Sequence, residues 1–206
     1  MIKKHDSGFT LIELLIVVAI IAILAAIAIP NFLAAQTRAK VSRQKAGMAS
    51  ALTAVEAYQV DNTAYPPCRL SSGKWLFEFP IECTTPIAYI TSRPTDIFER
   101  YQTSGDVMPI RYTKPGWGYN SSGFQVSNIY AWYANSFDDP AQGTYQVYSE
   151  SQAPIPFGVW GNGPATLLWT SDVDKQPFVK SSWYDPTNGT ISRGFLVKLA
   201  GGMTSP

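Results

Sequence analysis

The chain has 206 residues, of which 15% are charged and 13% are aromatic, and it contains 15 glycines and 15 prolines. This composition is typical of a loop-rich globular domain packed with aromatic side chains, and it excludes a disordered chain or a coiled coil. The formal net charge of +1 gives no general attraction to nucleic acid or to anionic lipid. The single histidine is His5. If the first eight residues are removed, histidine-dependent catalysis and histidine-ligated metals are excluded.

The first predicted element is an apolar helix. Residues 14–29 are all apolar, and Glu13 is the only charged residue between Phe9 and Pro30. A helix over residues 9–29 would cover about 31 Å at about 1.5 Å per residue, which is enough to cross a bilayer. A secretory signal peptide and a simple membrane anchor are the alternatives. The apolar run exceeds the usual length in signal peptides, and an anchor leaves the carboxylate of Glu13 unexplained.

The helix is predicted to continue to about residue 62, with an apolar stripe that would pack on a domain. Pro30 removes one backbone hydrogen bond, and this predicts a kink or local unwinding at that point. Basic residues flank the apolar segment on both sides, so the charge distribution does not orient it in a membrane. The residues of the stripe are Val41, Met48, Leu52 and Val55.

A specific resemblance begins at the leader. A short basic segment ends in Gly8, the residues Phe9-Thr10-Leu11-Ile12-Glu13 follow, and the apolar helix then reaches Pro30. This arrangement, over residues 1–62, resembles type IV pilins and the pseudopilins of type II secretion, the major pseudopilin in particular. The resemblance implies that a prepilin peptidase cuts after Gly8 and methylates the new amine of Phe9. It also implies an inner-membrane protein with its N-terminus in the cytoplasm.

The same resemblance implies an assembly role for Phe9, Glu13 and Pro30. Copies of the chain would wait in the bilayer until an assembly platform, with minor pseudopilins or pilins, stacks their helices into a fibre core. Glu13 would then face the amine of Phe9 from a neighbouring copy. Paired, each charge offsets the other, whereas each is costly alone in lipid. Local melting at Pro30 would let the helix extend during assembly.

The only two cysteines are Cys68 and Cys83. In an exported domain they are expected to form a disulfide that closes a modest loop and stabilises the fold by about 3 kcal/mol. The alternative is a pair of buried free thiols. Two cysteines without further ligands do not make a zinc site.

The rest of the chain predicts a small β-sheet. Residues 63–125 carry prolines and glycines at close intervals and are interpreted as a loop region between helix and sheet. The predicted fold is α+β, a pilin fold with one long N-terminal helix packed on a small antiparallel sheet. Strands are predicted at residues 123–133, 143–149, 165–171 and 191–199. The predicted organisation is a cleaved leader at 1–8, a transmembrane assembly helix at 9–30, an amphipathic helix at 31–62 and a globular periplasmic or extracellular domain at 63–206.

The C-terminal region raises the question of calcium. Residues 185–190 are predicted to form a turn, because Asn-Gly readily adopts a positive φ. Pseudopilins with similar tails often bind calcium there, and the oxygen ligands in this chain would come from Asp138, Asp139 and Asp185. Phe195 stands where the resemblance calls for an acidic residue, so ordinary solvated turns are the preferred interpretation and no cofactor is expected.

The sequence therefore predicts a structural fibre subunit and not an enzyme, since it has no phosphate-binding loop, nucleophile elbow or metal-spaced cluster. The favoured function is that of a pseudopilin in a type II secretion-like system. The alternative is a type IV pilin that forms a surface filament for adhesion, motility or DNA uptake. A membrane-anchored enzyme or sugar-binding module is a third alternative, which would leave Glu13 and the processing site as coincidences.

Overall fold

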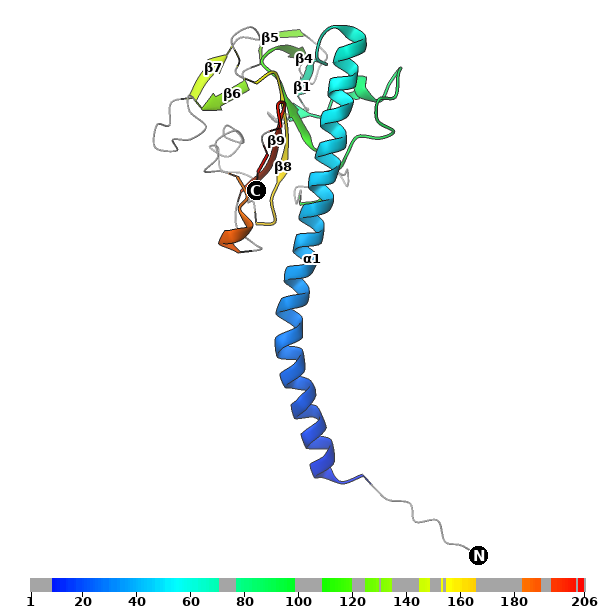
Figure 1. Ribbon diagram of the computed structural model, residues 1–206, viewed down its shortest axis with the longest axis vertical. Coiled ribbons are helices and arrows are strands. Elements are labelled where there is room, and N and C mark those ends of the chain that lie inside the picture. Colours follow the sequence, from blue (N-terminus) through cyan, green and yellow to red (C-terminus); the bar gives the residue numbers. More distant parts are fainter. Residues whose placement is uncertain are drawn as a thin grey trace, which may run out of the picture. The chain divides into compact units, whose positions relative to one another are not determined.

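The computed structural model describes residues 9–70, 77–98, 109–119, 125–129, 131–134, 145–148, 153, 155–165, 183–189, 194–202 and 204–205. The chain divides into two compact units, Met1–Ala39 and Lys40–Pro206. The helix α1 (Leu11–Asn62) runs from the first unit into the second (Figure 1). The predicted leader, residues 1–8, lies outside the described residues.

The long N-terminal helix is confirmed, since α1 covers 52 residues without a break. It also continues through Pro30, so the local unwinding predicted there is wrong for this structure. Proline removes one hydrogen bond from a helix interior. The turns before and after Pro30 remain helical, so the helix continues through this residue.

In the first unit, apolar side chains are exposed on all sides of α1. Leu11 is 75% exposed, Ile23 63% and Phe32 62%. The helix has the length and the composition to cross a membrane, and none of its most apolar window is buried. A helix that is apolar all round must be covered by lipid or by other chains. The exposure shows that this protein's own core does not supply that cover.

The second unit contains, among its described residues, nine strands arranged in three sheets. A three-stranded sheet has the order β3–β8–β9, a four-stranded sheet has the order β2–β1–β4–β5, and β6 pairs with β7. The strands are β1 (Cys68–Leu70), β2 (Phe77–Glu78), β3 (Arg111–Thr113), β4 (Gly116–Tyr119), β5 (Gln125–Ile129), β6 (Ala131–Ala134), β7 (Tyr145–Tyr148), β8 (Gly158–Asn162) and β9 (Phe195–Leu199). Two short 3-10 helices, η1 (Ile81–Cys83) and η3 (Pro186–Asn188), lie between them.

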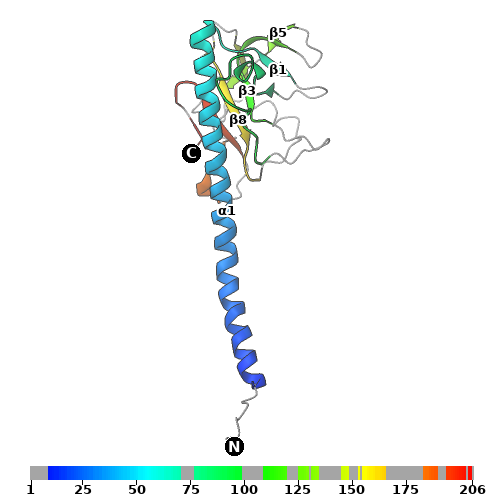
Figure 2. The same cartoon turned by 90° about the vertical axis from the view of Figure 1, so that its right-hand side faces the viewer.

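The three-stranded sheet β3–β8–β9 is antiparallel throughout, with β8 at its centre. The second half of α1 packs on it through one hydrophobic core, and Figure 2 shows β3 and β8 beside this part of the helix. Met48 and Val55 from the helix are at most 1% exposed, as are Tyr112 and Val159 from the sheet. This arrangement confirms the predicted α+β fold.

The individual strand predictions had mixed outcomes. The single strand predicted at 123–133 is wrong in part, because two strands of different sheets, β5 and β6, occupy this region and β6 ends at Ala134. The segment 143–149 contains β7 as predicted. β9 occupies the end of 191–199. Residues 166–171 of the remaining predicted strand lie outside the described residues. The interpretation of 63–125 as a loop region is wrong in part, because β1, β2, β3 and β4 lie within it.

Candidate functional site

The first candidate site is the start of α1, where a capping box surrounds Glu13. The Oε2 atom of Glu13 accepts hydrogen bonds from the backbone N–H and the hydroxyl of Thr10, both at 2.8 Å. In return, the Thr10 hydroxyl oxygen accepts from the N–H of Glu13 at 3.3 Å. This reciprocal Thr-x-x-Glu arrangement satisfies donors that a helix start otherwise leaves without partners.

Glu13 keeps part of its hydrogen-bonding capacity. Both bonds from Thr10 go to Oε2, and among the described residues Oε1 accepts none. The described ion pairs involve other residues, so no basic side chain neutralises this carboxylate within the described chain. One oxygen is thus held by the helix cap while the other is open to a donor from outside.

The structure places the other predicted assembly residues on the same segment without bringing them together. Phe9 directly precedes the capping residue Thr10 and is 75% exposed. Pro30 lies within α1, where its side chain is exposed. Gly8, the predicted cleavage residue, lies outside the described residues. Within one chain, then, the partner of Glu13 is Thr10, and the predicted pairing of Glu13 with Phe9 requires a second copy.

The two cysteines are buried and are not bridged to each other in this structure, which is the arrangement of the alternative to the predicted disulfide. Both side chains are 0% exposed and belong to the core under α1. The sulfur of Cys68 accepts a hydrogen bond from the N–H of Lys114 at 3.0 Å. Burial, reinforced by the nearby charge of Glu82, raises the pKa of Cys83 to about 12. A thiol with such a pKa stays protonated and unreactive near neutral pH.

The predicted turn at 185–190 is present, and it occupies the carboxylate of Asp185. One oxygen of Asp185 accepts hydrogen bonds from the hydroxyl of Thr187 at 2.7 Å and from its N–H at 2.8 Å, which caps η3. These two bonds lower the pKa of Asp185. Asp138 and Asp139 lie outside the described residues. Among the residues that are described, no cluster of three or more His, Cys, Asp or Glu could hold a metal. Two of the three predicted calcium ligands lie outside those residues, so the calcium site stays a prediction.

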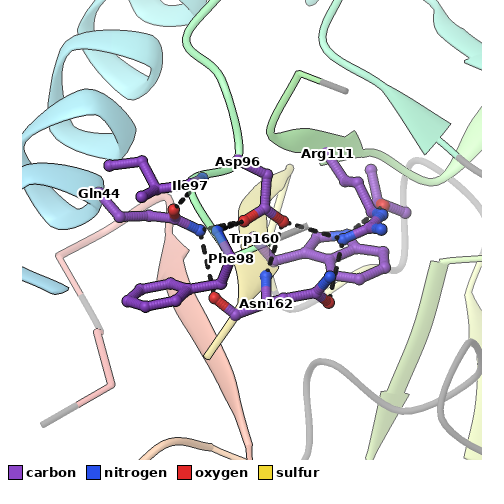
Figure 3. A network of polar contacts seen from close by, with 8 residues as sticks. Gln44, Asp96, Ile97, Phe98, Arg111, Trp160 and Asn162 are labelled. Carbon is purple, nitrogen blue, oxygen red and sulfur yellow. Dashed lines mark hydrogen bonds and ion pairs between the residues drawn. The ribbon is translucent and has the colours of Figure 1, made fainter. Parts of the chain in front are cut away.

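Sequence reasoning missed a buried polar network under the second half of α1 (Figure 3). Its centre is Asp96, whose side chain is 1% exposed and forms an ion pair with Arg111 at 3.3 Å. The guanidinium of Arg111 also lies over the ring of Trp160, 4.7 Å from its centre. Burial raises the pKa of Asp96, and the charge of Arg111 opposes that rise. Charged groups at this depth are stable only when they are paired and hydrogen-bonded.

The network ties the helix to the sheet. The side-chain amide of Gln44 on α1 donates to Asp96 Oδ1 at 2.8 Å, and its oxygen accepts from the N–H of Ile97 at 2.7 Å. On β8, the N–H of Asn162 donates to Asp96 Oδ2 at 2.8 Å. One feature of the sequence could have indicated this network, because Gln44 is a polar residue within the apolar stripe of the helix. In the structure Gln44 is only 1% exposed.

Comparisons with known proteins all concern a limited part of the chain. The family described as "Prokaryotic N-terminal methylation motif" matches residues 3–29. The type IV wide pilus major component PilA4 of Thermus thermophilus is 55% identical over 62 residues, which are 30% of this chain and 47% of that protein. Type II secretion system core protein G of Pseudomonas aeruginosa is 41% identical over 64 residues, 31% of this chain and 45% of that protein.

A third relative is the type IV major pilin protein PilA of Myxococcus xanthus, 53% identical over 63 residues, which are 31% of this chain and 29% of that protein. The chain therefore covers less than half the length of each of these three relatives. No solved structure gives a significant match. The similarity concerns a short part of the chain, and the methylation motif within it includes Phe9 and Glu13.

Proposed function

We propose that this chain, which belongs through its N-terminal motif to the family of type IV pilins and type II secretion pseudopilins, is a structural subunit of a helical fibre. One observation carries the proposal. The methylation motif opens a helix whose apolar segment is left exposed by the protein's own core, and this segment carries a single carboxylate, Glu13, with one oxygen still open. The apolar side chains of such a helix must be covered by lipid before assembly and by neighbouring helices in the fibre.

The energetics favour pairing Glu13 with a neighbour during assembly. After cleavage, the amine of Phe9 from another copy would supply the positive charge that Glu13 lacks within the described chain. Two unit charges 4 Å apart attract by about 4 kcal/mol at an effective dielectric constant of 20. The two hydrogen bonds from Thr10 go to a charged group, and bonds of that kind contribute about 1.5–3 kcal/mol each net. Both go to Oε2, so the charge pair can use Oε1 and add to the cap, and it also selects one height at which two helices fit together.

The proposed location and partners follow from this role. Before assembly the chain sits in the inner membrane, crossing it once with the N-terminus in the cytoplasm, where a prepilin peptidase removes residues 1–8 and methylates Phe9. An inner-membrane assembly platform and minor pseudopilins or pilins then join it to copies of itself. The region 63–206 lies on the periplasmic side or on the cell surface.

The machine we favour is a type II secretion-like system, in which the chain acts as a pseudopilin. The alternative is a type IV pilin in a surface filament. One observation supports this alternative. Two of the relatives named above are pilus proteins and are 55% and 53% identical to this chain in the matched part, whereas core protein G is 41% identical. Each of these matches covers about 30% of this chain, and both kinds of protein are among the relatives, so the comparisons do not separate the two functions.

Substitution of Glu13 tests the fibre proposal. Glu13→Ala should insert into the membrane and be processed normally, because alanine lowers the cost of the apolar span. It should then be absent from fibres, or enter them only when mixed with the native chain. The measurement is to shear the cells, separate fibres from membranes and blot both fractions. Glu56→Ala is the matched control, since Glu56 is exposed on the same helix and lies beyond the apolar segment. Native levels of Glu13→Ala in the fibre fraction would contradict the proposed pairing.

A further inference from the structure

The face of α1 that packs on the sheet has a repeating pattern. Val41, Gln44, Met48, Ala51 and Val55 are buried at alternating spacings of three and four residues. A pattern with a seven-residue period does not by itself fix where a helix sits along its partner. A shift by two turns, about 10.5 Å, would place Met48 where Val41 lies and Ala51 where Gln44 lies. Every member of this repeat is apolar except Gln44.

Gln44 makes contacts that only one position of the helix can supply. Its Nε2 donates to Asp96 Oδ1 at 2.8 Å and to the backbone oxygen of Asn162 at 3.3 Å, while its oxygen accepts from the N–H of Ile97 at 2.7 Å. The nitrogen and the oxygen of the Gln44 amide therefore both form hydrogen bonds (Figure 3). The site is also shaped for this side chain, since a Cβ on Gly161 would lie 2.4 Å from Nε2.

The partners of Gln44 are held in place by segments other than α1. Asp96 accepts hydrogen bonds from the N–H of Asn162 at 2.8 Å and from the N–H of Phe98 at 3.1 Å, and it pairs with Arg111 at 3.3 Å. The receiving site is thus built by β3, β8 and the segment before residue 99. In the two registers shifted by seven residues, Ala51 or Thr37 would take the place of Gln44 beside the Asp96 carboxylate and the Ile97 N–H. Alanine has no polar side-chain group, and threonine offers one short hydroxyl in place of the separate donor and acceptor of the amide. Each buried polar group left without its partner costs about 1–3 kcal/mol.

We propose that Gln44 sets the register of the second half of α1 on the β3–β8–β9 sheet. The apolar residues of the repeat supply most of the attraction, and the single buried amide selects one alignment among those that the repeat allows. A lone polar residue in an apolar heptad has the same effect in coiled coils, where it specifies register at some cost in stability. This role concerns the packing of the C-terminal unit and does not depend on the proposed fibre.

The structure offers a direct reporter of this register. A Cβ built on Gly47 of α1 would lie 3.5 Å from the Cβ of Pro94, within the range that a disulfide spans. The pair Gly47→Cys and Pro94→Cys therefore reports the native alignment. Lys40 and Ala54 lie seven residues before and after Gly47, so Lys40→Cys or Ala54→Cys with Pro94→Cys reports the two shifted alignments. Peptide mapping of the full-length chain separates these bridges from the native cysteines, both 0% exposed.

The test compares these three pairs with and without Gln44→Met, which keeps the length of the side chain and removes its hydrogen bonds. With Gln44 in place, only the 47–94 bridge should form. With Gln44→Met, the native and the two shifted registers become comparable in free energy, so the 47–94 bridge should fall to about a third of its native yield and a 40–94 or 54–94 bridge should appear. Gln59→Met is the matched control, since it makes the same change near the end of α1 and should leave the 47–94 bridge at its native yield.

Two results would overturn the proposal. If the 47–94 bridge forms as fully with Gln44→Met as without it and no shifted bridge appears, another feature sets the register. If Gln44→Met fails to fold, as judged by circular dichroism, Gln44 is needed for folding as such. The proposal would then be wrong, because it requires the apolar residues alone to hold the helix on the sheet.

Discussion

At the scale of single residues, Cys83 has the most specific chemistry. Burial raises its pKa to about 12, with a further contribution from Glu82, whereas an ordinary thiol has a pKa of 9.0. At pH 8 the folded protein should therefore hold about a thousandfold less thiolate at this position than the unfolded chain. Because the thiolate is the nucleophile, alkylation of Cys83 should be slow in the native protein and fast in denaturant.

The pH dependence of that reaction has a definite sign. In the unfolded chain the alkylation rate should level off as the pH passes 9, since the thiol is then ionised. In the native protein the rate should keep rising about tenfold per pH unit, because the pH is still well below the folded pKa. Peptide mapping after iodoacetamide treatment measures both rates. Equal rates in the two states, or a Cys68–Cys83 disulfide in protein purified from the host, would contradict two buried thiols that are not bridged to each other.

Residue-scale prediction from the sequence is most specific where one residue breaks a long pattern. Glu13 stands alone in an apolar run, and this pattern identifies it as a candidate without coordinates, while its role in assembly stays a prediction. The Gln44–Asp96 contact was not predictable in this way, because its partners are 52 residues apart and meet only after the sheet has formed. The cysteines show a further limit, since the expected compartment favoured a disulfide, while both thiols are buried in the core and are not bridged in this structure.

At the scale of elements, two glycines predict opposite effects on stability. Gly47 lies in α1, where an added Cβ would make only an ordinary contact at 3.5 Å, so Gly47→Ala should stabilise the fold by about 1 kcal/mol through helix propensity. Gly161 lies in β8, where an added Cβ would lie 2.4 Å from Gln44 Nε2 and 3.1 Å from Asp96 Oδ2. Gly161→Ala should cost about 1–3 kcal/mol through overpacking.

Thermal unfolding of the full-length chain in detergent measures the difference. A change of 1 kcal/mol shifts the Tm by about 2–4 °C for a chain of this size, so the two variants should move in opposite directions by a resolvable amount. If both variants raise the Tm, the close approach of α1 to β8 would be contradicted.

The helix was predictable because neighbouring residues alone indicate it, over many turns. An apolar run is followed by an amphipathic stripe, and neither pattern depends on distant parts of the chain. The strands were harder for physical reasons. All residues of β8 are buried, so its sequence lacks the alternation that marks a strand with one solvated face. β1 is three residues long and pairs in parallel with β4, a partner distant in sequence. Its existence depends on that partner, and local composition does not show it.

At the scale of the whole molecule, the open choice is between secretion and surface filaments. If the chain is a pseudopilin, deletion of its gene should leave secreted proteins in the periplasm while long surface filaments persist. The measurement compares culture supernatant and periplasm for secreted proteins, with electron microscopy of the cell surface. Complementation with the native gene is the control. Loss of filaments with normal secretion would show that the chain is a pilin.

The central claim is that the chain is processed at its N-terminal motif and then assembled through the exposed apolar helix. Intact mass and N-terminal sequencing of the chain in sheared fibres from the native host test this claim most directly. We expect a mature chain that begins at Phe9 and carries one methyl group on its amine. A chain in that fraction that begins near Ile29 would indicate ordinary signal peptidase and contradict cleavage after Gly8, as would a chain that keeps residues 1–8.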